Sequence, residues 1–424
     1  MSDSATNENL REGRGERGDF GKDQGVGMKK GWQTTQLSAV AAVQSGAGFP
    51  DRYQGQSDGE IPFYKVSDMN IAGNEREMVF ENNSITEEAR RELGAFLFPQ
   101  GSTIFPKIGG AIATNKKRLT TRDCCVDNNV MGVIPKLGKI NSELLFYFFL
   151  AHDLSEFANE AHLPSIRKTV VEDWPIILPV SLAEQQRIVG LLDEAFEGLA
   201  TAKTNAEKNL QNARALFESH LQSVFTQRGP GWVEKKVSEI AKHSLGKMLD
   251  KAKNKGEPQP YLRNINVRWF TFDLSDLLQM PFLPTEVEKY TAIKGDVLIC
   301  EGGYPGRAAI WDEDYPIYFQ KALHRVRFHE TELNKWFVYY LSVQDSSGQL
   351  KQHFSGTGIQ HFTGEVLARF PIPVPPLPEL RRAVAKFDAL SEQTQRLARL
   401  YEQKLVALEA LKKSLLHQAF TGEL

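Results

Sequence analysis

Two long segments of the chain carry apolar residues at helical spacing and contain no proline. They run from Leu182 to Phe225 and from Glu379 to Phe420. Apolar side chains that recur every three to four residues share one face of an α-helix, so each segment is predicted to be a single helix. In the first, residues spaced seven apart are Leu192, Leu199, Ala206 and Ala213, with Phe196, Leu210 and Phe217 nearby. In the second, the predicted contact face is Leu390, Thr394, Leu397, Tyr401, Lys404, Leu408, Leu411 and Leu415.

Such faces are what two helices bury against each other in a coiled coil. A helix of about 40 residues is roughly 60 Å long, which exceeds the width of a globule of about 150 residues. The first helix leads from the first half of the chain to the second, and the second helix leads back. The pattern therefore predicts antiparallel pairing. The alternative is that each helix packs only on its own domain.

The rest of the chain consists of short apolar runs bounded by Gly, Pro, Asn and Asp, which is typical of strands joined by loops. Apolar runs at Leu144–Leu150 and Trp336–Leu341 predict one buried helix in each half. Strand-like, Pro-rich runs at residues 175–179 and 371–376 come directly before the long helices. Each half is thus predicted to be an α+β globule.

The two halves repeat each other. Gly31 and Trp32 open the first copy and Gly231 and Trp232 open the second. The last helical turns also correspond, because Leu221, Val224, Phe225 and Thr226 lie 195 residues before Leu416, Ala419, Phe420 and Thr421. This spacing is far longer than that of a solenoid repeat. The sequence predicts an α+β protein with two similar globular domains separated by two long helices, which form an antiparallel coiled coil with an internal pseudo-two-fold axis.

Composition restricts the classes of partner. The formal net charge is −2, so any nucleic-acid surface must be a local patch. The three cysteines, Cys124, Cys125 and Cys300, are too few for a disulfide framework, and the longest apolar run has only eight residues. These features, and a polar start without the apolar core of a signal peptide, predict a cytoplasmic protein. Residues 1–27 have few core-forming residues and are predicted to be a disordered tail, with Met28 as a candidate native start.

The chain lacks the common catalytic motifs. It has no phosphate-binding loop, no Gly-x-Ser-x-Gly turn, no His-Glu-x-x-His and no Asn-Pro-Pro-Tyr or Asp-Pro-Pro-Tyr signature. Asp296 and Glu301 could form a nuclease carboxylate pair, but no lysine lies two residues after Glu301. The nine histidines form no clustered set of metal ligands. The absence of these catalytic motifs favours a binding protein over an enzyme.

Basic and amide side chains gather in loops at matching places in both copies. Lysine and arginine suit phosphates, while arginine, asparagine and glutamine can bond base edges in the major groove. Each cluster taken alone is more often a solvated surface, but the recurrence favours DNA binding. The candidate residues of the first copy are Lys107, Asn115, Lys116, Lys117, Arg118, Arg122, Ser165, Arg167 and Lys168. Those of the second are Lys247, Lys251, Arg263, Asn264, Arg268, Arg307, Lys321, His324, Arg325, Gln360 and His361.

The copies share apolar positions and differ at polar ones. Aligning Pro175 with Pro371 pairs Ile166 with Phe362, but Ser165 with His361 and Arg167 with Thr363. A shared scaffold with different loops is what two domains need if each reads a different short DNA sequence.

The closing motif resembles a known family. Residues 175–189, their echo at 371–379 and the terminal Leu-Leu-His-Gln-Ala-Phe-Thr-Gly-Glu-Leu are similar to the specificity subunit of type I restriction-modification systems. The resemblance covers residues 28–424. It implies two target-recognition domains that each read one part of a split site on double-stranded DNA, joined by helical spacers that hold two methyltransferase subunits. A restriction subunit with motor and nuclease activity joins for cleavage.

By this resemblance the chain is not itself an enzyme, has no catalytic or metal-binding residues and binds no cofactor. S-adenosylmethionine, ATP and magnesium are expected on its partner subunits. The expected boundaries are a tail at 1–27, target-recognition domains at 28–180 and 228–377, and helical spacers at 181–227 and 378–424. The second copy departs from the family pattern at Glu379, Leu380 and Arg381, which predicts a different contact where the second helix starts.

Two alternatives remain at this point. One is a nuclease or methyltransferase component with an active site of its own. The other is a coiled-coil adaptor with no DNA role.

Overall fold

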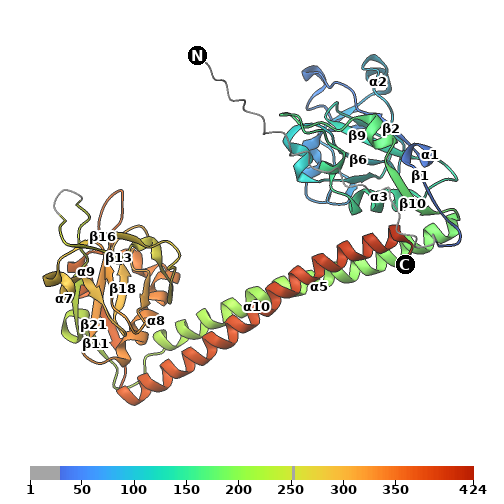
Figure 1. Ribbon diagram of the computed structural model, residues 1–424. Coiled ribbons are helices and arrows are strands. Elements are labelled where there is room, and N and C mark those ends of the chain that lie inside the picture. Colours follow the sequence, from blue (N-terminus) through green and yellow to red (C-terminus); the bar gives the residue numbers. More distant parts are fainter. Residues whose placement is uncertain (1–28, 251–253) are drawn as a thin grey trace, which may run out of the picture. The chain divides into compact units, whose positions relative to one another are not determined.

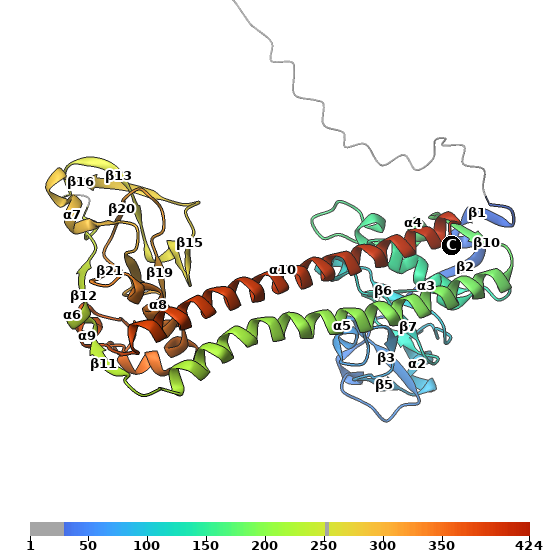
Figure 2. The same cartoon turned by 90° about the horizontal axis from the view of Figure 1, so that it is seen from below.

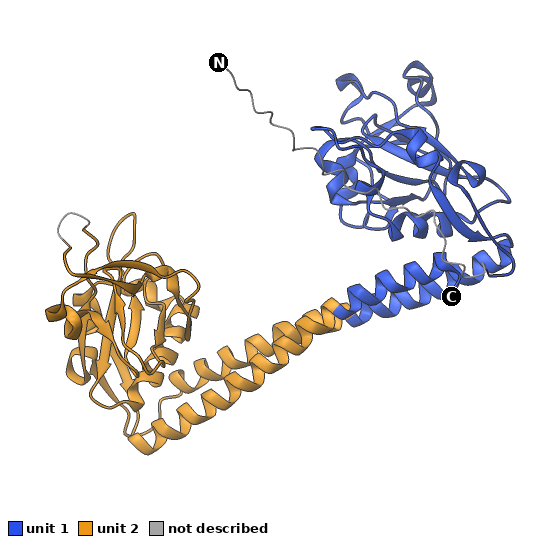
Figure 3. Ribbon diagram, in the orientation of Figure 1, with its two compact units in different colours: residues 1–202, 407–424 blue, residues 203–406 orange. Residues whose placement is uncertain are grey.

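The computed structural model describes residues 29–250 and 254–424. The predicted tail at 1–27 and the candidate residue Lys251 lie outside the described residues. The chain divides into two compact units, shown in Figure 3. Unit 1 contains residues 1–202 and 407–424, and unit 2 contains residues 203–406.

Unit 1 is a mixed α+β domain (Figure 1). Its strands are β1 (Trp32–Gln36), β2 (Ala41–Ser45), β3 (Ile61–Tyr64), β4 (Glu77–Met78), β5 (Ser84–Ile85), β6 (Thr103–Pro106), β7 (Arg118–Thr120), β8 (Cys125–Val126), β9 (Val130–Pro135) and β10 (Pro175–Pro179). Its helices are α1 (Leu37–Val40), α2 (Glu87–Glu92), α3 (Ser142–Ala151) and α4 (Lys168–Glu172), with short 3-10 turns η1 (Asp51–Tyr53), η2 (Val66–Asn70), η3 (Gly109–Thr114) and η4 (Leu154–Phe157). The strands form sheets of order β2-β9-β6-β7-β4 and β5-β3-β8, and β1 pairs with β10.

Unit 2 repeats this plan with added elements. Its strands are β11 (Val233–Lys236), β12 (Ala241–Leu245), β13 (Glu257–Leu262), β14 (Val267–Arg268), β15 (Thr271–Phe272), β16 (Leu278–Phe282), β17 (Thr291–Ala292), β18 (Val297–Cys300), β19 (Ala308–Ile310), β20 (Ile317–Phe319), β21 (Leu323–Phe328) and β22 (Pro371–Val374). Its helices are α6 (Val237–Ile240), α7 (Val287–Tyr290), α8 (Glu332–Ser346) and α9 (Gly364–Arg369), with 3-10 turns η5 (Asn264–Asn266), η6 (Pro284–Glu286) and η7 (Gln349–His353). The sheets have the orders β12-β21-β18-β19, β16-β13-β20-β17 and β14-β15, and β11 pairs with β22.

The strand pairing confirms the internal duplication. The opening strand of each unit is antiparallel to its Pro-rich closing strand, as β1 with β10 and β11 with β22. The series β2-β9-β6 corresponds to β12-β21-β18. Even the less common parallel contact recurs, as β3 with β8 and β13 with β20. The repeated sequence therefore specifies the same topology twice.

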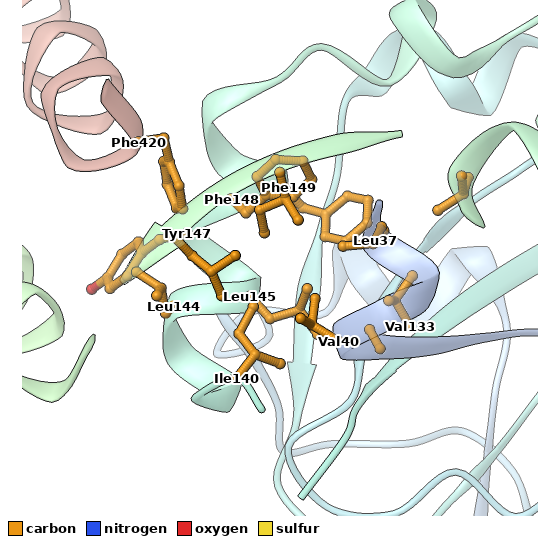
Figure 4. Packing of buried hydrophobic residues seen from close by; sticks show 14 of the residues in the cluster. Leu37, Val40, Val133, Ile140, Leu144, Leu145, Tyr147, Phe148, Phe149 and Phe420 are labelled. Carbon is orange, nitrogen blue, oxygen red and sulfur yellow. The ribbon is translucent and has the colours of Figure 1, made fainter. Parts of the chain in front are cut away.

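A buried helix forms the centre of each unit, as predicted. Six consecutive residues of α3, from Leu144 to Phe149, are buried, and Figure 4 shows several of them within the core. The ring of Phe148 meets that of Phe420 edge to face at 5.6 Å. In unit 2, Trp336 of α8 is fully buried and its indole nitrogen donates to Pro373 O at 2.8 Å. In unit 2 the closing strand β22 is thus fixed to the buried helix α8.

The two predicted long helices are α5 (Leu182–Thr226) and α10 (Leu377–Thr421), each of 45 residues. Within each unit they run antiparallel (Figure 2). In unit 2, Arg214 of α5 forms a 2.7 Å ion pair with Glu402 of α10. In unit 1, the ammonium of Lys412 lies 5.3 Å from the ring centre of Phe196. The ends of the helices also enter the domain cores. Each long helix therefore packs both on the other long helix and on a globular domain.

The contact face of α10 differs from the predicted one at every second position. Thr394 is buried and Tyr401 and Leu408 are half-buried, as predicted. Leu397 and Leu411, however, are 40% and 48% exposed, and the next residues on the face after Thr394 and Tyr401 are Ala398 and Leu405. The buried face therefore advances by four residues and then three from Thr394, whereas the predicted face advanced by three and then four.

A tyrosine on the buried helix of each unit bonds an aspartate on a long helix. Tyr147 on α3 donates to Asp193 on α5, and Tyr339 on α8 donates to Asp388 on α10 at 2.6 Å. Burial and the adjacent carboxylate raise the pKa of both phenols, which keeps them protonated donors. The same polar contact thus fixes each domain to a long helix.

No helix among residues 29–250 and 254–424 is long and apolar enough to cross a membrane.

Candidate nucleic-acid interface

In each unit the backbone joins two of the predicted loops. In unit 1 the Gly-rich loop after β6 meets the segment before α4, because Ile166 N donates to Lys107 O at 2.9 Å and Gly109 N donates to Pro164 O at 2.8 Å. In unit 2 the loop after β18 meets the segment before α9, because Phe362 N donates to Glu301 O at 2.7 Å. Residues far apart in the sequence are therefore brought to one place, at the end of β6 and of β18. We call these places junction 1 and junction 2.

Junction 1 contains four of the predicted residues. Lys107 is half-buried, its ammonium donates to Ser45 Oγ at 3.0 Å, and burial lowers its pKa despite the opposing effect of Asp127. Ser165 Oγ accepts from Asn159 Nδ2 at 3.2 Å. Arg167 and Lys168 are exposed, and Lys168 forms only a loose 3.7 Å ion pair with Glu172. Two exposed cations thus lie next to a small polar loop.

The other basic residues of the first copy form a separate group around β7. Lys117 and Arg118 are buried, because β7 lies inside the five-stranded sheet between β6 and β4. Lys117 donates to Asn115 Oδ1 at 2.5 Å and to His152 O at 2.8 Å, and burial lowers its pKa to about 8. Arg118 donates to Met69 O at 2.9 Å. These two side chains hold the domain together, and their burial leaves no surface for DNA.

Two further residues of this group are less enclosed. Lys116 is half-buried and donates to Asn70, and Arg122 is exposed and pairs with Glu81. To bind DNA, these two side chains would have to exchange their present partners, Asn70 and Glu81, for phosphate groups.

Junction 2 gathers four of the predicted residues. Asn264 Nδ2 donates to Gly302 O at 3.0 Å, and Arg307 Nη2 donates to Asn264 O at 3.0 Å. The imidazole of His361 lies against Gly302, and Gln360 beside it is exposed. His361 and Ser355 exchange backbone hydrogen bonds of 2.9 Å, which closes the loop that carries Gln360. The backbone therefore presents these side chains from two fixed loops.

Six other predicted residues that the structure describes in unit 2 are not part of the two loops that form junction 2, although a ring nitrogen of His324 lies 3.0 Å from Phe362 O of that junction. Arg263 and Arg268 are half-buried and bond to Asp276 and Ile265 O respectively, and Lys321 is exposed. His324 and Arg325 are buried on β21, which has a neighbouring strand on each side. Burial lowers the pKa of His324 to about 4, and Arg325 donates to Thr291 O at 2.5 Å. These two therefore stabilise the domain and leave no surface for DNA.

Lys247 is also buried. Its ammonium donates to Pro281 O at 2.8 Å and pairs with Glu286 at 2.6 Å. A lysine enclosed in this way fixes β16 to the segment after β12 and is not free to meet a phosphate.

The suspected nuclease carboxylates do not form a pair. Asp296 is buried, and both of its oxygens accept from Arg327, at 2.7 and 2.6 Å. Glu301 follows the opposite end of β18. Among residues 29–250 and 254–424 no group of three His, Cys, Asp or Glu side chains could hold a metal ion.

The start of the long helices differs between the copies, as predicted. Gln185 is fully buried, accepts from Asn141 N at 2.7 Å and donates to Pro179 O at 2.8 Å and Lys139 O at 3.2 Å. The corresponding Leu380 is also fully buried but packs in the apolar core of unit 2. A hydrogen-bonded anchor in one copy is thus an apolar anchor in the other.

A model of the type I restriction modification DNA specificity domain matches the chain twice, over residues 29–210 and 230–405. These ranges cover most of the chain, so the chain belongs to this family. Together with the duplicated fold, membership defines a DNA-recognition subunit of a type I restriction-modification system.

Two solved structures share the fold at low sequence identity. One, from a study of complex assembly and conformational transition of the type I restriction-modification system, has a TM-score of 0.72 and 18% identity over 94% of this chain and 99% of that chain. The other, the HsdS subunit from Thermoanaerobacter tengcongensis, has a TM-score of 0.64 and 19% identity over 94% of this chain and 98% of that chain. A comparison with curated protein sequences gives no match.

Proposed function

We propose that each unit reads one half of a split recognition site on double-stranded DNA, and that the chain itself carries out no catalysis. The observation that carries this proposal is the recurrence of one loop junction with different side chains. Junction 1 presents Arg167 and Lys168, whereas junction 2 presents Gln360, His361 and Arg307. A conserved backbone with different polar groups suits two domains that read different bases.

The proposed DNA-contacting residues are those at the two junctions, together with the accessible cations beside them. Exposed arginine and lysine can meet phosphates and fix the register of the domain, while amide, imidazole and guanidinium groups can bond base edges. The buried residues Lys117, Arg118, Lys247, His324 and Arg325 are assigned to the stability of the domains instead.

The long helices are proposed to hold two methyltransferase subunits, to which a restriction subunit is added for cleavage. In support, α10 exposes Leu397 and Leu400 on its surface, beside Arg396 and Arg399. Exposed leucines at helical spacing suit a helical partner. S-adenosylmethionine, ATP and magnesium are proposed to bind to those partner subunits. We also propose a cytoplasmic location, because the DNA that the protein would bind lies there.

The test is a comparison of the purified chain on two duplexes and with or without partner subunits. Mapping methylated positions in the host genome first identifies both half-sites and their separation. We expect tighter binding to that split site than to random DNA, and no cleavage or methylation by the chain alone. Equal binding to both duplexes would contradict DNA reading, and activity without partners would contradict the non-catalytic assignment.

Replacing Gln360 and His361 with alanine is expected to weaken recognition of one half-site only. Side-chain contacts to a base are worth about 1 to 3 kcal/mol each, and the loop should persist because Ser355 and His361 are joined through the backbone. The measurement is binding to duplexes in which either half is scrambled. Arg167→Ala in unit 1 is the matched control and should affect the other half. If one variant lost equal affinity for both half-sites, the proposal that each unit recognises a different half-site would be contradicted.

A further inference from the structure

The loop of residues 301–307 at junction 2 carries an aromatic side chain, Tyr304, that is not among the residues predicted to contact DNA. Tyr304 is 66% exposed, although most aromatic side chains of this unit lie in its core. The guanidinium carbon of Arg307 lies 4.2 Å from the centre of the Tyr304 ring. The exposed tyrosine ring and the arginine over it thus form one cation–π pair.

Backbone hydrogen bonds hold the loop that presents this pair in one conformation. Arg307 N donates to Tyr304 O at 3.1 Å, Gly306 N donates to Cys300 O at 2.9 Å and Glu301 N donates to Ala322 O at 2.8 Å. Gly303 has a φ of +79°, and a Cβ there would lie 2.3 Å from Asn264 Nδ2. Only glycine combines this backbone conformation with such close packing.

Arg307 is held in place from two sides. Tyr304 covers the face of its guanidinium, and Asn264 O accepts from Nη2 at 3.0 Å. Its Nε is buried and has no acceptor among the described residues. A guanidinium that is already oriented loses less side-chain entropy when it binds a ligand. Its remaining Nη protons can donate to two acceptors that lie in one plane.

The pair is absent from the equivalent loop of unit 1. There the same backbone junction is made by Lys107 and Ile166, but the longer loop of residues 107–117 contains no aromatic residue, and it ends in the buried Lys117 before β7, where Arg307 precedes β19. The fold of the loop therefore does not require an aromatic residue or an arginine. A feature that the fold does not require, exposed at one junction and missing from the other, fits a role in reading one half-site.

We propose that Tyr304 and Arg307 form a base-reading pair in the major groove. Arg307 donates to the O6 and N7 acceptors of a guanine, while the Tyr304 ring orients the guanidinium and packs on the neighbouring base. This inference rests on the proposed function, because it assumes that junction 2 faces DNA. It further assigns a guanine to the half-site that unit 2 reads.

The test measures binding of the full chain to four duplexes: the intact site, the site with either half scrambled, and random DNA. Tyr304→Ala and Arg307→Lys should each lose between about fivefold and about 100-fold in affinity for the intact site. The same loss should appear on the duplex that retains the half-site of unit 2, and none on the duplex that retains the other half. Tyr304→Phe keeps the ring and should bind like the unaltered chain.

The control is Tyr315→Ala, because Tyr315 is 50% exposed in the same unit but follows the far end of β19. It should bind like the unaltered chain. Unchanged binding by Tyr304→Ala, an equal loss on random DNA, or an equal loss in Tyr304→Phe would overturn the base-reading pair. If the unaltered chain fails to distinguish the split site from random DNA, the proposed function itself fails, so the two failures are distinguishable.

Discussion

Replacing Gln185 with alanine should lower the stability of unit 1 by about 3 kcal/mol, since one buried and two partly buried backbone groups would lose their partner. Asn141 N, Pro179 O and Lys139 O all bond the Gln185 amide, which is fully buried. Each buried polar group left without a partner costs about 1 to 3 kcal/mol, although water entering the space can offset part of that. These bonds fix the start of α5 to the end of β10 and to the segment before α3.

Hydrogen exchange resolved by peptide is the suitable measurement, because the chain has two units and need not unfold in one step. We expect exchange in α3 and β10 to accelerate by roughly 100-fold, and exchange in unit 2 to stay unchanged. Gln186→Ala is the matched control: the neighbouring side chain is exposed and, among the described residues, accepts only from Asn141 Nδ2, at 2.8 Å. Similar exchange in the two variants would show that the buried amide is not an anchor.

The architecture could be predicted from the sequence because it depends on patterns that are local or repeated. The absence of proline and the helical spacing predicted α5 and α10, and both helices end within a few residues of the predicted bounds. The apolar run at Leu144–Leu150 predicted a buried helix, and α3 buries six consecutive residues of that run. Because the two copies repeat each other, each of the shared elements could be predicted twice, once from each copy.

The candidate site could be predicted only in part. The matched loops do meet, at junctions 1 and 2, because the two copies share a topology that brings them together. Burial of single side chains could not be read from the pattern. Lys117 and Arg325 look like surface cations in the sequence, yet each lies beside or within an inner strand and donates to backbone carbonyl oxygens. Long basic side chains can satisfy distant carbonyl groups in this way, and only the tertiary structure shows which ones do so.

Tyr304 illustrates the opposite difficulty. Aromatic residues usually lie in the core, so one tyrosine among loop glycines carries little weight in a sequence. Tyr304 becomes a candidate for DNA contact only because its side chain is exposed and lies next to Arg307. Neither property can be predicted from the spacing of residues in the sequence.

Lengthening both long helices by four residues should change the separation of the two half-sites that the protein accepts. We place the insertions between Gln211 and Asn212 in α5 and between Gln403 and Lys404 in α10, where all four residues are exposed. These sites are close to the Arg214 and Glu402 ion pair, so both helices grow at the same level. Four residues are slightly more than one helical turn, so the contact face continues with only local unwinding.

Four helical residues add about 6 Å, which corresponds to at most about two base pairs of DNA at 3.4 Å each. We therefore expect the lengthened protein to bind a site with a longer spacer and to lose most of its affinity for the original spacing. A series of duplexes with graded spacers measures this directly. The bases read in each half should not change, because junctions 1 and 2 lie outside the helices.

The control is an insertion of the same four residues beside Leu137, which is fully exposed in the loop between β9 and α3. That protein gains the same length of chain without a longer helix, so it should keep the original spacing. If the helical insertions left the preferred spacer unchanged, the long helices would not determine the distance between half-sites. If the loop insertion altered the spacer as well, the effect would reflect a general disturbance of the chain and not the length of α5 and α10.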